Sequence, residues 1–205
     1  LATGCAIPAR PVAASPAAAA RWHGAVDWDK AGDEAVEVLR QYLRVDTTNP
    51  PGNETRGAEF MGKILEREGI PFEIVEYAPG RGNLIARLDG GDQERPLCLL
   101  SHIDVVTAEA EKWPPGKGPL SGALEDGYVW GRGALDMKGL GALELMTMVW
   151  LKRLQVPLRR SIILLAVAAE ESDSGGVQFV VDKHWGKIGC SHSVNEGGLG
   201  IRDLI

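Results

Sequence analysis

The feature that most limits the fold of this chain is an uninterrupted apolar run over residues 162–169, which leads directly into two glutamates. Its Ile, Leu, Val and Ala residues make it the strongest strand candidate in the sequence. A shorter run over residues 97–100 has no polar alternation either, which is typical of a strand covered on both faces. A strand of this kind needs other elements packed on each side of its sheet.

Weaker patterns divide the rest of the chain into alternating strands and helices. Asp33 is a suitable N-cap for a helix that ends near Arg44, and Gly69 is suited to end a second helix over residues 55–68. Further helices are expected over 139–154 and 175–184, and strands over 72–77, 83–88, 97–101, 161–169 and 190–195. Strands that alternate with helices predict a three-layer α/β/α sandwich with a mostly parallel central sheet.

The chain of 205 residues is long enough for one large domain, and its N-terminal part has a different composition from the rest. Residues 6–20 are almost only Ala and Pro, so we expect a tether over residues 1–27 and a folded domain over 28–205. Residues 1–5 resemble the end of a bacterial lipoprotein signal, with Cys5 as the residue that would carry a lipid anchor. An arbitrary start of the sequence is the alternative, which leaves both a cytoplasmic and an envelope location open.

Charge and composition argue against several classes of function. A net charge of −6 argues against nucleic acid as a partner, and no run of about 18 apolar residues predicts a membrane span. The three cysteines form no C-x-x-C pair, so a cysteine zinc knuckle is not expected, and Cys98 in its apolar run is interpreted as a buried, inert thiol. Gly131 and Gly133 lack the third glycine of a dinucleotide-binding loop.

Polar side chains gather just past the ends of the expected strands. One histidine and five acidic residues take such positions or lie in a glycine-flanked turn: His102, Asp104, Asp136, Glu170, Glu171 and Glu196. In open α/β sheets, ligands bind outside the carboxyl ends of the strands. The sequence therefore predicts that these side chains converge on one rim of the sheet.

Imidazole nitrogen and carboxylate oxygen are ligands that catalytic Zn²⁺ prefers. His102 and Asp104 are two residues apart, so in an extended segment they share a face, and Asp104 is placed to orient the imidazole. Asp136 has two carboxylate oxygens, enough to bridge two metal ions about 3.5–4 Å apart. The plainer alternatives are a structural histidine and an aspartate that caps the following helix.

Glu170 and Glu171 are adjacent, so in extended chain their side chains point in opposite directions. A division of roles follows, in which one glutamate binds metal and the other moves the proton of the attacking water. A solvated acidic pair on the surface is the alternative interpretation.

Five segments in this order resemble the di-zinc family that contains aminoacylase-1, glutamate carboxypeptidase and succinyl-diaminopimelate desuccinylase. The matching segments are Thr48–Gly52, Ser101–Val106, Gly131–Gly139, Ala169–Glu171 and Asn195–Gly198. The resemblance covers roughly residues 30–200 and implies the catalytic domain of a zinc peptidase.

The resemblance also implies a ligand set for two zinc ions, with Co or Mn as substitutes. His102, Asp136 and Glu196 would hold one zinc. Asp136 would bridge to a second zinc that Glu171 also binds. The last ligand of that second ion would be a histidine supplied from beyond Ile205.

The two remaining acidic residues receive catalytic roles by the same resemblance. Glu170 would be the general base and acid, and Asp104 would steady His102. Family members carry a cis peptide after the bridging aspartate, so we expect one between Asp136 and Met137.

The implied activity is hydrolysis of an amide or peptide bond next to a carboxylate in a small peptide, of the carboxypeptidase or dipeptidase type. An N-acyl amino acid deacylase and a non-catalytic metal-binding fragment are the alternatives. Family members continue with a lid domain used for dimerisation and with further catalytic sequence, whereas this chain stops at Ile205. We therefore expect the chain alone to be inactive, and a homodimer only with the lid domain.

Overall fold

The computed structural model describes residues 25–91 and 94–197. The tether predicted over residues 1–27 falls almost entirely outside these residues, and Cys5 falls wholly outside them. The helices are α2 (Trp28–Leu43), α3 (Glu54–Arg67), α4 (Lys138–Arg153) and α5 (Gly175–Ile188), with one 3-10 turn, η1 (Ala110–Lys112). The strands are β1 (Thr48–Asn49), β2 (Phe72–Ala78), β3 (Arg81–Leu88), β4 (Leu97–His102), β5 (Val105–Val106), β6 (Ala123–Glu125), β7 (Tyr128–Trp130), β8 (Ile162–Val167) and β9 (His192–Val194). None of the described helices has the length and apolar character needed to cross a membrane.

The central sheet has five strands in the order β2-β3-β8-β4-β9. β4 lies between β8 and β9 and is parallel to both, whereas β3 is antiparallel to its neighbours β2 and β8. All strands except β3 therefore run in the same direction, which confirms the prediction of a mostly parallel sheet. β3 is reversed because a tight turn at Gly80, with φ of +76°, joins it to β2 as a hairpin.

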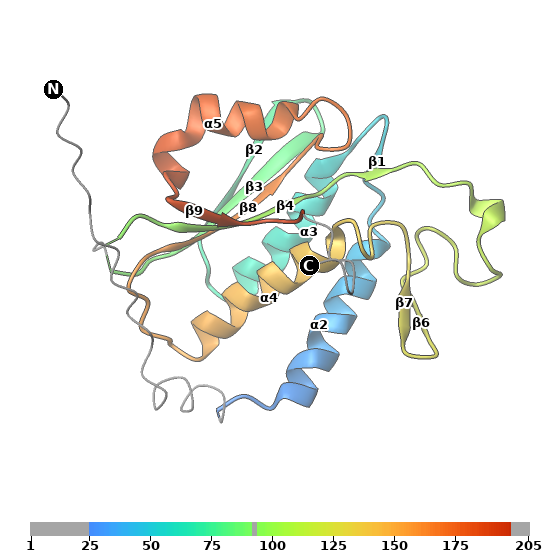
Figure 1. Ribbon diagram of the computed structural model, residues 1–205, viewed down its shortest axis with the longest axis horizontal. Coiled ribbons are helices and arrows are strands. Elements are labelled where there is room, and N and C mark those ends of the chain that lie inside the picture. The colour runs from blue at the N-terminus through green and yellow to red at the C-terminus, as the bar shows by residue number, and fades with distance from the viewer. Residues whose placement is uncertain (1–24, 92–93, 198–205) are drawn as a thin grey trace, which may run out of the picture.

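Helices cover both faces of this sheet, as the sequence predicts (Figure 1). α5 packs on one face, while α3 and α4 pack on the other and α2 lies against α4. Alternate side chains of β8 enter the two cores: Ile162, Leu164 and Ala166 face the α3 and α4 side, and Ile163, Leu165 and Val167 face the α5 side. The apolar run that forms β8 thus lies in the middle layer of a three-layer sandwich.

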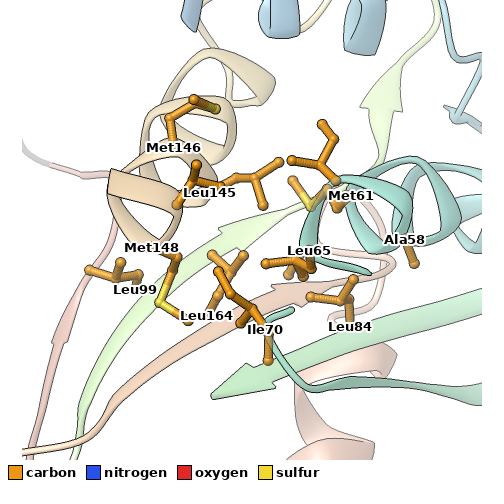
Figure 2. Packing of buried hydrophobic residues seen from close by; sticks show 14 of the residues in the cluster. Ala58, Met61, Leu65, Ile70, Leu84, Leu99, Leu145, Met146, Met148 and Leu164 are labelled. Carbon is orange, nitrogen blue, oxygen red and sulfur yellow. The ribbon is translucent and has the colours of Figure 1, made fainter. Parts of the chain in front are cut away.

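The larger core lies between the sheet and the helices α3 and α4. Figure 2 shows its packing, with side chains from both helices in contact with the central strands: Ala58, Met61, Leu65, Ile70, Leu84, Leu99, Leu145, Met146, Met148 and Leu164. Full burial of each large side chain contributes about 1.5–3 kcal/mol. This core fixes β4 and β8 against α4, and the polar side chains that follow those strands are fixed with them.

The first helix starts earlier than the sequence predicts. Asp33 was expected to be the N-cap of the first helix, and this is wrong, because α2 begins at Trp28 and the side chain of Asp27 accepts a hydrogen bond from the backbone N–H of Lys30 at 3.2 Å. The prediction that Gly69 ends the second helix, α3, is confirmed. Gly69 has φ of +64° and donates its backbone N–H to Glu66, as a left-handed C-cap does.

The interpretation of Cys98 as an inert thiol is wrong, although the residue is buried as expected. Cys98 in β4 forms a disulfide with Cys190, which lies just before β9, and their Cα atoms are 5.8 Å apart. The two positions meet because β4 and β9 are neighbours in the sheet. Their sequence separation of 92 residues leaves no local pattern that could reveal the pair.

Candidate metal centre

The carboxyl ends of β4, β8 and β9 meet at one rim of the sheet, together with the start of α4. His102 is the last residue of β4 and pairs in register with Val167, the last residue of β8. Three segments then supply the acidic residues that follow β8, follow β9 and precede α4: Glu170 and Glu171, Glu196, and Asp136. The rim therefore gathers the side chains that the sequence placed at strand ends.

The imidazole of His102 is the buried centre of this group. Its Nε2 atom lies 3.1 Å from Asp136 Oδ1 and 3.4 Å from Glu196 Oε1. The ligand atoms of these three residues all lie within 4.8 Å of one another. A tetrahedral ion with bonds near 2.0 Å separates neighbouring ligand atoms by roughly 3.3 Å. The donor set fits a divalent metal ion in both chemistry and spacing.

The alternative that Asp136 caps helix α4 is wrong. The N-cap residue of α4 is Met137, and it makes no side-chain cap hydrogen bond. The Asp136 side chain is 60% exposed and its nearest polar partner is His102. The peptide bond between Asp136 and Met137 is cis, as expected from the resemblance.

The second ring nitrogen of His102, Nδ1, faces Asp104 and not the rim. This Nδ1 atom lies 2.9 Å from the backbone carbonyl oxygen of Asp104 and 3.6 Å from the Asp104 carboxylate. The carbonyl is thus closer than the carboxylate that the sequence argument considered. With a proton on Nδ1 donated to this carbonyl, the Nε2 lone pair points at the rim, as metal binding by imidazole requires.

The carboxylate of Asp104 instead organises the segment after β8. It is fully buried and accepts hydrogen bonds from the Asn49 side chain at 2.8 Å and from the backbone N–H groups of Glu170 and Glu171 at 3.0 and 3.1 Å. Burial works against its charge, but the adjacent imidazole of His102 and the hydrogen bond from Asn49 outweigh burial and lower the pKa of Asp104. One carboxylate therefore connects the histidine to the two glutamates.

Glu170 and Glu171 lie in a turn and not in extended chain, so the argument from alternating side chains does not apply to them. Glu170 Oε2 lies 4.0 Å from His102 Nε2, close to the three candidate ligands. Glu171 stands outside that three-residue group. Its pKa is raised by partial burial and by the nearby charge of Asp136.

The electrostatics of the rim favour a cation. Burial opposes a charge on His102, but Asp104 and Asp136 outweigh it and raise the pKa of the imidazole to about 9. Partial burial raises the pKa of Glu196, and Asp136 and Glu170 add to that rise while His102 offsets part of it. Crowded carboxylates around one imidazole repel each other less when a positive ion lies between them.

Two further residues support the rim, and sequence reasoning gave neither of them a role. Asn49 donates from one side-chain nitrogen to both Asp104 and Ser172, at 2.8 and 3.0 Å. It lies inside the segment Thr48–Gly52, so its position was noted but its contact was not. Lys138 is fully buried beside the Asp136 loop, and burial lowers its pKa to about 7.

Comparison with known proteins places this rim in a family. A model of peptidase family M20/M25/M40 matches residues 98–201, which is about half of the chain and includes every candidate ligand. The chain belongs to peptidase family M20/M25/M40. The family assignment agrees with the resemblance drawn from the five sequence segments.

Individual M20 relatives are similar over the same region. A succinyl-diaminopimelate desuccinylase of Wolbachia pipientis wMel is 33% identical over 146 residues, which cover 68% of this chain and 34% of the relative. An M20 family metallo-carboxypeptidase from Sulfolobus solfataricus has a TM-score of 0.69 at 21% identity, covering 80% of this chain and 37% of that one. Human carnosine dipeptidase 1 has a TM-score of 0.68 at 22% identity, covering 84% and 40%. The chain thus spans about a third of the length of the curated relative, and the two structures support the fold.

Proposed function

We propose that the protein is a zinc-dependent hydrolase that cleaves an amide or peptide bond next to a carboxylate, as carboxypeptidases and dipeptidases do. The observation that carries the proposal is the meeting of His102, Asp136 and Glu196 within 4.8 Å, with Glu170 beside them. One imidazole and two carboxylates form a ligand set that zinc accepts in catalytic sites, where one position stays open for water. Cobalt and manganese are the expected substitutes.

His102, Asp136 and Glu196 would hold one ion. Asp136 and Glu171 would contribute to holding a second ion. Divalent ions supply Lewis-acid activation of water and of the amide carbonyl when they are bound. Asp104 and the backbone carbonyl beside it keep the imidazole of His102 turned toward the rim.

Glu170 moves the proton in this proposal. Its carboxylate accepts a proton from the attacking water and later gives it to the leaving nitrogen, as a general base and then a general acid. The backbone N–H of Glu170 is bound to the Asp104 carboxylate at 3.0 Å, which fixes where the side chain starts. A purely structural metal site needs no such group, so Glu170 argues against the non-catalytic alternative.

A second candidate within the same chemistry is an N-acyl amino acid deacylase. The relative named succinyl-diaminopimelate desuccinylase favours it, because removal of a succinyl group from an amine is also hydrolysis of an amide bond. Both candidates use the same residues in the same roles. Only the substrate distinguishes them, and the chain spans about a third of that relative's length.

The test uses the complete gene product, stripped of metal and titrated with zinc by calorimetry, then assayed with dipeptides and with N-acyl amino acids. Glu170→Gln is expected to lower kcat by at least about 10²- to 10⁴-fold while zinc affinity is unchanged. His102→Ala is expected to weaken zinc binding itself. Glu109→Gln is the matched control, because Glu109 is an exposed glutamate paired with Lys112.

Three outcomes would contradict the proposal. Loss of zinc in the Glu170→Gln variant would make Glu170 a ligand and not the base. Turnover that is unaffected in this variant would remove Glu170 from the reaction. Zinc binding without turnover of either substrate class would favour the non-catalytic alternative.

A further inference from the structure

The chain that leaves β8 has an unusual set of partners. Four consecutive backbone N–H groups, which no longer belong to the sheet, are each bound by a buried side chain from another part of the fold. The pairs are Ala168 with Asn83 at 3.0 Å, Ala169 with Glu54 at 3.2 Å, and Glu170 and Glu171 with Asp104 at 3.0 and 3.1 Å. The position of Glu170 is therefore set by side chains from β3, from the start of α3 and from the loop after β4.

Glu54 is the member of this set that binds the residue directly before Glu170. Its side chain is fully buried at the first residue of α3, and Arg81 neutralises it through two hydrogen bonds of 2.6 and 2.7 Å. A buried carboxylate with such a partner is stable only when its remaining lone pairs are also satisfied. The backbone N–H of Ala169 satisfies one of them, which ties α3 to the residue just before Glu170.

Ala169 needs this support because of its backbone conformation. Its φ is +62°, in the left-handed region that residues with a Cβ atom rarely adopt. The turn at Ala169 brings the following residue back toward Asp104 and His102, and it is closed by a hydrogen bond from Ser174 N–H to the Ala169 carbonyl at 2.7 Å. A backbone held in a disfavoured conformation persists only where its surroundings enforce it.

We infer that Glu54, held by Arg81, is a positioning residue that keeps Ala169 in its left-handed conformation and so sets where the Glu170 carboxylate stands relative to His102. This inference rests on the proposed role of Glu170 as the general base. The hydrogen bonds of the Glu54 carboxylate go to Arg81 and to the backbone N–H groups of Asn53 and Ala169, so it acts on Glu170 through the Ala169 backbone. Its loss should therefore change the proton-transfer step and leave metal binding in place.

The experiment compares variants of the complete gene product by kcat, KM and zinc stoichiometry. Glu54→Ala is expected to lower kcat by about 10- to 100-fold, the usual range for residues that orient a catalytic group. KM and zinc stoichiometry are expected to stay within about twofold, because the lost interaction matters only in the transition state. Glu54→Gln keeps an oxygen that can accept from Ala169, so its loss of kcat is expected to be smaller.

A rescue experiment separates positioning from general stability. Glycine adopts the left-handed conformation without steric cost, so Ala169→Gly should reduce the need for Glu54. The double variant Glu54→Ala with Ala169→Gly is expected to recover part of the kcat lost in Glu54→Ala alone, measured against Ala169→Gly as its own reference. A merely structural role for Glu54 predicts no such recovery.

Arg153→Gln is the matched control, because Arg153 forms an ion pair with Glu68 at 2.6 Å on the opposite side of the fold from the rim. It is expected to lower stability and to leave kcat unchanged. If Glu54→Ala does not fold, Glu54→Gln and Arg81→Lys carry the test, since each keeps part of the network and should lower kcat by an intermediate amount. A folded Glu54→Ala with wild-type kcat, or a double variant without recovery, would overturn the inference.

Hydrogen exchange distinguishes this inference from the proposed function. Glu54→Ala is expected to speed exchange of the backbone amides of residues 169–171, and Arg153→Gln is not. If the wild-type protein shows no turnover, the proposed function fails, and unchanged exchange in Glu54→Ala would show separately that Glu54 does not hold this turn. Faster exchange in Glu54→Ala, in a protein without turnover, would show that Glu54 holds the turn but would overturn its role in catalysis.

Discussion

The ammonium group of Lys138 donates a hydrogen bond to the backbone carbonyl of Val45 at 2.7 Å and a longer one to Tyr42 at 3.3 Å. These carbonyls lie at and just beyond the end of α2, where a helix has no internal donors left for its last carbonyl groups. Lys138 is also two residues past Asp136. The contact therefore connects the loop that carries the candidate ligand Asp136 to the end of α2, more than 90 residues earlier in the sequence.

Replacement of Lys138 by alanine is expected to lower the free energy of unfolding by about 2–5 kcal/mol, because it leaves a cavity and removes the 2.7 Å hydrogen bond to the Val45 carbonyl. Lys138→Met fills the same volume, so its cost should be about 1–3 kcal/mol from the lost hydrogen bond to the Val45 carbonyl alone. Urea unfolding measures both, with Lys152→Ala on the exposed side of α4 as the control. Equal losses for the alanine and methionine variants would contradict this account.

Glu144 predicts a pH dependence of stability. It is buried in α4, burial raises the pKa of its carboxyl to about 7 from an ordinary 4.5, and the Ser101 hydroxyl offsets only part of that rise. Between these two pH values the folded state binds a proton that the unfolded state has released, so stability falls as pH rises from about 4.5 to 7. The contribution is roughly 3 kcal/mol, fully present below the lower value and lost above the upper one.

Glu144→Gln removes the titrating group while keeping the shape of the side chain. Urea unfolding between pH 4.5 and 7 should therefore show a flatter pH profile for this variant than for the wild-type protein. Glu59→Gln, an exposed change on α3, is the control and should keep the wild-type slope. A profile for Glu144→Gln as steep as that of the wild-type protein would show that other groups cause the dependence.

The Cys98–Cys190 disulfide predicts the thiol content of the protein. In denaturant without reductant, only one of the three cysteines, Cys5, should react with a thiol reagent, and all three should react after reduction. The double replacement by alanine is expected to cost about 2–4 kcal/mol of stability, the usual contribution of a disulfide that closes a long loop. Three reactive thiols before reduction would mean that the bridge does not form in the purified protein.

We expect the stability of the protein to depend on the charge of the side chain at position 49, which contacts the Asp104 carboxylate. Asn49→Ala removes a buried hydrogen bond of 2.8 Å and should cost about 1–3 kcal/mol. Asn49→Asp should be more harmful than alanine, because it places a second carboxylate against that of Asp104. Thermal or urea unfolding of the zinc-free protein ranks the two, and a more stable aspartate variant would show that Asn49 does not act as a donor.

Much of the fold could be predicted because its strands and long helices carry local patterns. The runs at 97–100 and 162–169 are apolar throughout because both faces of these strands are covered, and this is visible without any knowledge of partners. The first residue of α2 was missed because Asp27 and Asp33 are both suitable caps, and only the three-dimensional path of the chain selects Asp27. The two-residue strands β1 and β5 are too short to produce a period.

The candidate site also has a part that the sequence predicts and a part that it does not. Its acidic residues could be found because each lies within a few residues of a strand or helix that the sequence predicts. The side chains that hold those residues in place could not, because Glu54 reaches Ala169 across 115 residues and Asn49 reaches Asp104 across 55. Contacts of this kind leave no periodicity, because the two partners are far apart in the sequence.

The pairing of His102 with Val167 at the ends of β4 and β8 has a consequence for how such a protein tolerates change during evolution. One residue inserted into β4 would move the histidine by about 3.3 Å and turn its side chain to the opposite face of the sheet. One residue inserted into β8 would shift the chain that leads to Glu170 by the same amount. Insertions within these strands should thus be purged by selection. The segment between β5 and β6 has no such constraint on its length, so related genes are expected to differ there in size.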